Sequence, residues 1–122
     1  MRMLLVDDNI DIAEVICFYC HSKDIDCDCI NEGRKALDSI QREKYDLILL
    51  DLAMPGFSGL DVIKSLKELG GIESKNIVIF TASSDRNIVD KIKDSGIKEI
   101  FKKPCSLNDL TELIERYRPS TK

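Results

Sequence analysis

The sequence is short of the residues on which several classes of function depend. Its 122 residues include no tryptophan, one histidine and three prolines, and no apolar run is long enough for a membrane span or a signal peptide. Eighteen Lys and Arg face 22 Asp and Glu, a formal net charge of -4. Because phosphate-backbone binding needs surplus positive charge, this balance disfavours nucleic acid as a direct partner. We expect a cytoplasmic, non-membrane protein whose partners are proteins or small molecules.

Cysteine is less scarce. The five residues are Cys17, Cys20, Cys27, Cys29 and Cys105. Their odd number, in a chain without secretory features, argues against a disulfide framework and predicts reduced thiols. The Cys-x-x-Cys pair followed by His21, with two more cysteines nearby, has zinc-ligand character. However, Cys17 and Cys20 also continue the apolar stripe of a predicted helix, and burial as small side chains is the simpler interpretation.

The most informative stretch is a run of branched apolar residues that stops at a carboxylate. Residues 47–50, Leu-Ile-Leu-Leu, lack polar alternation, which is typical of a parallel strand covered on both faces. Turn chemistry at Pro55, Gly56 and Gly59 follows. Asp51 therefore ends a buried strand, at the sheet edge where open α/β folds bind ligands. There it can serve as a nucleophile or metal ligand, although a plain loop residue is the alternative.

Strand-like and helix-like segments alternate along the whole chain. The predicted strands are 3–6, 25–30, 47–50, 76–80 and 97–101, and the predicted helices are 10–21, 33–42, 59–69, 85–95 and 107–117. A helical segment separates each strand from the next, so the connections are crossovers and the strands are parallel. We predict a doubly wound α/β domain with helices on both faces of a five-stranded sheet. The flavodoxin-like order 2-1-3-4-5 would place strands one and three side by side.

Polar groups follow four of the predicted strands. They are Asp7 and Asp8 after the first, Asp51 after the third, Thr81 after the fourth and Lys103 after the fifth. Clustered carboxylates repel one another unless a cation lies among them, and hard oxygen ligands favour Mg²⁺, with Mn²⁺ as a substitute. A lysine and a hydroxyl can hold the remaining oxygens of a phosphoryl group. Taken singly, Thr81 or Asp7 can equally be a helix cap, and Lys103 a surface charge.

These residues resemble the response-regulator receiver domain of two-component signalling, similar to the stand-alone chemotaxis type. The motifs are the Asp7-Asp8 pair, the segment 51–59, Thr81-Ala82 and Lys103-Pro104. The resemblance implies that Asp51 accepts a phosphoryl group from the phosphohistidine of a histidine kinase or a phosphotransfer protein. It also implies that Asp8, Asp51 and the Ala53 carbonyl bind Mg²⁺, that Asp7 assists through water, and that Thr81 and Lys103 contact the phosphoryl group.

The resemblance carries expectations about organisation as well. It implies a single receiver domain over residues 1–122, without an output domain, that switches a protein-binding surface after phosphorylation. The protein would not be an enzyme beyond catalysing its own phosphorylation and dephosphorylation. A transient dimer through the fourth helix, fifth strand and fifth helix is open to such a domain. The sequence does not identify the cognate kinase or the downstream target.

Two departures and three rivals accompany this interpretation. Family members usually carry an aromatic switch residue three positions before the lysine, where this chain has Ile100. Phe101 follows it, and alternation along the strand would turn Phe101 to the opposite face from Ile100. Ala53 and Ser83, at positions that often tune the phosphoryl lifetime, present no acid or amide to orient attacking water. A haloacid-dehalogenase-type phosphatase, which also forms an aspartyl phosphate, needs a second Asp at the position of Ala53. The acidic loop after strand one argues against a flavodoxin, because negative charge there would repel the phosphate of a flavin. The clustered carboxylates argue against a non-phosphorylated adaptor, which does not need them.

Overall fold

The computed structural model describes residues 1–81, 90, 92, 95–102 and 106–119. The strands are β1 (Arg2–Val6), β2 (Asp26–Ile30), β3 (Leu47–Leu50), β4 (Ile77–Thr81) and β5 (Glu99–Lys102). The helices are α1 (Ile10–Ser22), α2 (Gly33–Arg42), α3 (Gly59–Leu69), a 3₁₀ turn η1 (Ile72–Lys75) and α5 (Leu107–Tyr117). The predicted helix 85–95 falls largely outside the described residues.

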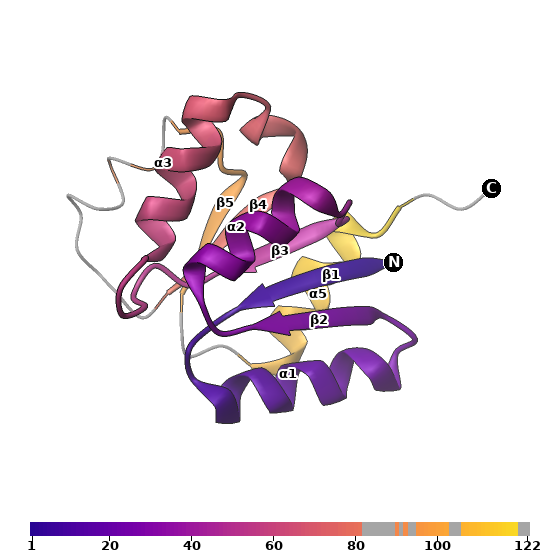
Figure 1. Ribbon diagram of the computed structural model, residues 1–122. Coiled ribbons are helices and arrows are strands. Elements are labelled where there is room, and N and C mark those ends of the chain that lie inside the picture. Colours follow the sequence, from indigo (N-terminus) through magenta and orange to yellow (C-terminus); the bar gives the residue numbers. More distant parts are fainter. Residues whose placement is uncertain (82–89, 91, 93–94, 103–105, 120–122) are drawn as a thin grey trace.

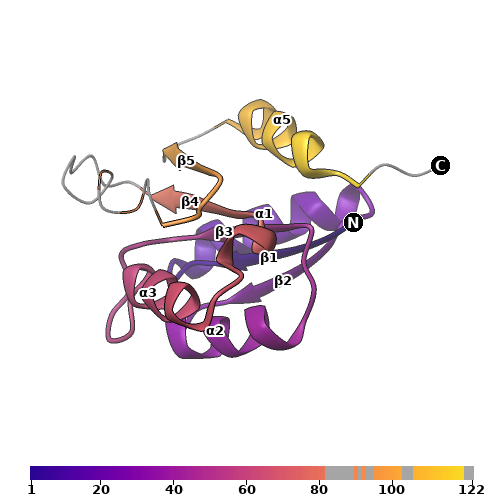
Figure 2. The same cartoon turned by 90° about the horizontal axis from the view of Figure 1, so that it is seen from above.

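The five strands form one sheet in the order β2-β1-β3-β4-β5, with every neighbouring pair parallel. The predicted fold class and strand order are therefore confirmed. Helices α1 and α5 cover one face of the sheet, and α2 and α3 cover the other (Figures 1 and 2). Among the helices in the described part of the chain, none is long and apolar enough to cross a bilayer.

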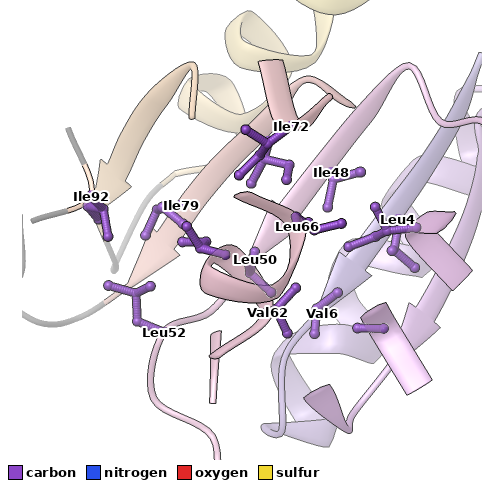
Figure 3. Packing of buried hydrophobic residues seen from close by; sticks show 14 of the residues in the cluster. Leu4, Val6, Ile48, Leu50, Leu52, Val62, Leu66, Ile72, Ile79 and Ile92 are labelled. Atoms are coloured by element: carbon purple, nitrogen blue, oxygen red, sulfur yellow. The ribbon is translucent and has the colours of Figure 1, made fainter. Parts of the chain in front are cut away.

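Alternation along the central strands divides the core into two halves. Leu4 and Val6 of β1 join the cluster beneath α2 and α3, whereas Met3 and Leu5 join the cluster beneath α1 and α5. Figure 3 shows the first cluster, where strand side chains meet Val62 and Leu66 of α3. Because β3 and β4 are buried on both faces, residues 47–50 and 77–80 are apolar without interruption, as is typical of parallel central strands, and the buried Thr81 ends β4.

The structure adds one element and modifies another. The two glycines after α3 both have positive φ, 86° for Gly70 and 81° for Gly71, and they lead into η1, which the sequence pattern did not indicate. Strand β2 lies at the sheet edge, as the predicted strand order requires, and one of its acidic residues, Asp28, makes contacts with neighbouring side chains. Asp28 pairs with Arg2 at 3.0 Å and accepts the Tyr45 hydroxyl at 2.9 Å.

The prediction of reduced thiols is wrong for two cysteines. Cys17 on α1 and Cys29 on β2 form a disulfide, with Cα atoms 7.1 Å apart. Burial describes Cys20, which is fully buried, but Cys17 and Cys27 are only half-buried and Cys29 is exposed. Cysteine spacing along a sequence does not show which side chains of the edge strand face which turn of α1, so the sequence could not reveal this approach.

Candidate functional site

The site lies where β1 and β3 end beside each other. Val6 and Leu50 are register partners in the parallel ladder, and the Asp51 backbone N–H donates to the Val6 carbonyl over 2.9 Å. The residues that follow, Asp7 and Asp51, are therefore neighbours at the same sheet edge. Asp7, Asp8 and Asp51 each offer a carboxylate oxygen within 4.8 Å of the others. The predicted convergence of the three acids is present.

Main-chain donors orient the two inner carboxylates. The Asn9 N–H donates to Oδ1 of Asp7 at 2.9 Å, and the Ala53 N–H donates to Oδ1 of Asp51 at 3.2 Å. Asp7 is 1% exposed and Asp51 5%, whereas Asp8 is exposed. These hydrogen bonds fix the two buried carboxylates, whereas Asp8 is the solvent-exposed member of the cluster. The Ala53 backbone, a predicted metal ligand through its carbonyl, is thereby held beside Asp51.

The connection from β3 to α3 packs tightly behind Asp51. A Cβ built on Gly59 would collide with the backbone of Asp51 and Leu52, so only glycine fits there. The sequence pattern had indicated that Gly59 belongs to a turn, but it had not indicated this close approach to the Asp51 backbone. Ser58 and Asp61 then form a capping box that starts α3, and hydrogen bonds from the Ser58 N–H and hydroxyl lower the pKa of Asp61.

The site extends along the sheet toward β4 and β5. Thr81 ends β4 and is 1% exposed, and β4 pairs with β3 so that Ile79 lies beside Leu50. Thr81 pairs in register with Lys102, the last residue of β5. Lys103 comes next in the sequence, but it lies outside the described residues, as do Ala82, Ser83 and Pro104. The structure therefore locates five members of the predicted set, Asp7, Asp8, Asp51, Ala53 and Thr81. The role of Lys103 stays a prediction.

The predicted contrast between Ile100 and Phe101 is seen in β5. Ile100 packs against the cluster beneath α2 and α3, and Phe101 against the cluster beneath α1 and α5. The Phe101 ring lies 5.9 Å from that of Phe80, tilted by 45°. Phe101 therefore belongs to the core of the opposite face, as strand alternation predicted.

Sequence reasoning missed the part played by Asn9. This residue caps helix α1, where its side chain accepts the Ile12 N–H at 3.2 Å. The same residue also presents its backbone N–H to Asp7, which links the start of α1 to the orientation of a site carboxylate. An acid followed two residues later by a capping residue is a signal that could have suggested this turn.

The donor set fits a small, hard divalent cation. Three carboxylates within 4.8 Å of one another carry concentrated negative charge, and no thiol or imidazole is among them. Mg²⁺ is commonly held by one or two carboxylates while it retains several waters for binding phosphate oxygens. The half-open arrangement, with two buried acids and one exposed acid, suits an ion that must also remain accessible to a phosphoryl group.

Comparisons with known proteins agree with this geometry. The sequence model of the response regulator receiver domain matches residues 3–115. Sporulation initiation phosphotransferase F of Bacillus subtilis is 26% identical over 118 residues, which are 97% of this chain and 94% of that protein. The DNA-binding response regulator MtrA of Mycobacterium tuberculosis is 33% identical over 109 residues, 89% of this chain. The chain spans about half (46%) of the length of MtrA.

Solved structures give the same result. The response regulator TrrA of Thermotoga maritima, determined in complex with Mg²⁺-BeF, is 26% identical with a TM-score of 0.80, covering 96% of this chain and 98% of that one. The chemotaxis protein CheY4 of Vibrio cholerae has a TM-score of 0.84 at 22% identity, with the same coverage of 96% and 98%, which supports the fold alone.

Proposed function

Because the chain belongs to the response regulator receiver domain family, whose members are signalling domains of two-component systems rather than classical enzymes, we propose that Asp51 is its phosphoryl acceptor. The observation that carries this proposal is the meeting of Asp7, Asp8 and Asp51 within 4.8 Å at the carboxyl end of the sheet. A single buried acid at a strand end has many structural roles, whereas three acids at one edge repel one another, and a bound cation relieves that repulsion.

Asp51 would act by attacking phosphorus with one carboxylate oxygen. An O–P bond forms as the N–P bond of a donor phosphohistidine breaks, and the imidazole nitrogen keeps the bonding electrons. A carboxylate is a weak nucleophile, so the rate depends on position and on neutralising the phosphoryl oxygens. The β1–β3 ladder and the Ala53 N–H supply the position, since both fix Asp51 through the main chain.

The remaining members have supporting parts. Asp8 and Asp51, with the Ala53 carbonyl, would hold Mg²⁺, and Asp7 would act through a bound water; Mn²⁺ has the same preference for oxygen ligands. When bound, the ion neutralises charge on the phosphoryl oxygens and on the acids. Thr81 and Lys103 would donate to the phosphoryl oxygens once transfer is complete.

A protein donor suits the surface next to the site. Helix α1 starts three residues after Asp7, and it exposes Val15 (60%) and Phe18 (79%) to solvent. Apolar side chains so exposed on the helix that follows a reaction site are typical of a contact for another protein. We propose that a histidine kinase or phosphotransfer protein docks there to present its phosphohistidine. Dimerisation through the fourth helix, β5 and α5 stays a prediction, since that helix lies largely outside the described residues.

The alternatives account for less. A phosphatase that forms an aspartyl phosphate needs a second acid where the chain has Ala53, which is exposed and carries no functional group. A non-phosphorylated adaptor leaves the acidic cluster without a task. DNA binding belongs to the name of MtrA, but the chain covers less than half of that protein and has a net charge of -4, so we do not extend DNA binding to it.

Intact-mass measurement after incubation with acetyl phosphate and Mg²⁺ tests the proposal. The wild type should gain one phosphoryl group, and Asp51→Asn should gain none. Glu68→Gln, which removes the same charge from an exposed position on α3, is the matched control and should be phosphorylated like the wild type. Full phosphorylation of Asp51→Asn would refute the assignment of the acceptor.

A further inference from the structure

Three cysteine side chains converge at a place that phosphoryl chemistry does not use. Cys27 and Cys29 are two residues apart on β2, so both point to the α1 side of the sheet, and Cys17 faces them from α1. The Sγ atoms of all three lie within 4.8 Å of one another, and those of Cys17 and Cys27 are 3.5 Å apart. A single disulfide uses two sulfurs and leaves the third unexplained.

The surroundings of this cluster are rich in sulfur. Cys20, one turn from Cys17, donates from Sγ to Sδ of Met3 at 3.9 Å. The Cys20 side chain also makes a hydrogen bond with that of Cys27. Five sulfur atoms from α1, β1 and β2 are thus close together, and soft ligands of this kind select thiophilic cations over Mg²⁺.

The backbone spacing also suits an ion. The Cα atoms of Cys17 and Cys29 are 7.1 Å apart, slightly beyond the 4.4–6.8 Å usual for disulfides. Two thiolates joined through a metal span a wider gap, because two bonds of about 2.3 Å replace one of about 2.05 Å. In a tetrahedral site those bonds place neighbouring sulfurs roughly 3.8 Å apart, close to the 3.5 Å between Cys17 and Cys27.

An entry route exists. A hollow of about 340 Å³ opens between α1 and the end of β2, and Cys17 and Cys29 form part of its wall together with Asp7 and Glu14. An ion can therefore reach the sulfurs from solvent without unfolding of the edge strand. The two carboxylates in the wall would favour the approach of a cation.

We propose that Cys17, Cys27 and Cys29, with the disulfide reduced, form a three-thiolate site for a thiophilic cation of the zinc class, distinct from the acidic site. Reduction by a phosphine moves two electrons into the S–S bond, and water supplies the oxygen of the phosphine oxide and the protons of two thiols. Binding then releases up to three protons as the thiols become thiolates, and water completes the tetrahedral coordination.

The experiment compares three proteins with Zn²⁺ and Co²⁺ as probes. Wild type, Cys27→Ser and Cys105→Ser are reduced with a phosphine, freed of metal and titrated in excess Mg²⁺, which occupies the acidic site. The two variants have equal numbers of thiols. Cys105 follows β5 in the sequence, and β5 lies at the opposite edge of the sheet from β2. Thiolate-to-cobalt charge-transfer absorption identifies sulfur ligation specifically.

We expect the reduced wild type and Cys105→Ser to bind one equivalent of metal with this absorption and with release of protons. Cys27→Ser should bind Zn²⁺ about a hundredfold more weakly or worse, since loss even of a partner that supports a ligand costs about 10–100-fold. Wild type kept oxidised should not show the absorption. Equal affinity in the two variants, or no thiolate absorption in the reduced wild type, would overturn the site. Neither result depends on phosphorylation of Asp51.

Discussion

Removing the negative charge of Asp51 should make the metal-free protein more stable. Asp7 and Asp51 are both buried, with carboxylate oxygens no more than 4.8 Å apart. At that distance, two unit charges repel by roughly 3.5 kcal/mol if the effective dielectric constant is about 20. Both acids also have favourable polar contacts, so we expect a net gain of about 1–2 kcal/mol for Asp51→Asn. The amide keeps the shape of the side chain and an oxygen for the Ala53 N–H.

The assay is urea unfolding in EDTA and again in Mg²⁺. With an m-value of about 1–3 kcal/mol/M, the midpoint of Asp51→Asn should rise by roughly 0.3–2 M in EDTA. Mg²⁺ at ten times its dissociation constant should stabilise the wild type by about 1.4 kcal/mol and the variant far less. Glu68→Gln removes the same charge at an exposed position. Its midpoint in EDTA should change little, and Mg²⁺ should stabilise it as much as the wild type. A variant less stable than the wild type in EDTA, with an unchanged response to Mg²⁺, would refute the electrostatic reasoning.

Three further predictions concern the surroundings of the site. Gly59→Ala should destabilise the protein by about 1–3 kcal/mol and slow its phosphorylation, because the added methyl group displaces the Asp51 backbone; unfolding and phosphorylation rates measure this, and unchanged values would contradict the packing. Because the pKa of Asp61 is lowered on folding, its carboxylate stabilises the protein fully at pH above the pKa of the unfolded state, near 3.8. This stabilisation is lost as the pH falls through the pKa of the folded state, so Asp61→Asn should flatten the acid side of the plot of stability against pH. On adding Mg²⁺ and beryllofluoride, backbone amide shifts should be large in residues 82–86, which lie outside the described part, while methyl rotamers of Ile100 stay unaltered; an Ile100 flip with unchanged shifts at 82–86 would contradict this.

Much of the fold could be predicted because its parts repeat one simple pattern. The continuous apolar runs at 47–50 and 77–80 indicated buried parallel strands, and the crossover rule left few strand orders. The turn η1 escaped prediction because Gly70 and Gly71 look alike as helix terminators whether the chain then extends or turns again. The contact between Cys17 and Cys29 escaped it for another reason, since it depends on how α1 lies over β2.

The candidate site was predictable to the same degree as the sheet. Once β1 and β3 were placed together, Asp7 and Asp51 had to meet, because their positions follow from strand ends rather than from side-chain detail. What sequence could not supply was the support behind Asp51, because the close approach of Gly59 to its backbone is a three-dimensional contact between a loop and a helix start. The Asn9 N–H on Asp7 is a local contact, for which the sequence did carry a signal.

The ladder bond from the Asp51 N–H to the Val6 carbonyl has an evolutionary consequence. Together with the turn N–H groups of Asn9 and Ala53, it places the two inner acids by main-chain atoms, which every amino acid other than proline supplies alike. Side chains that face solvent can therefore be exchanged freely, provided that strand pairing and the packed core survive. A lineage can alter most of its surface, and with it the choice of partner, while the carboxylates that perform the chemistry stay in place.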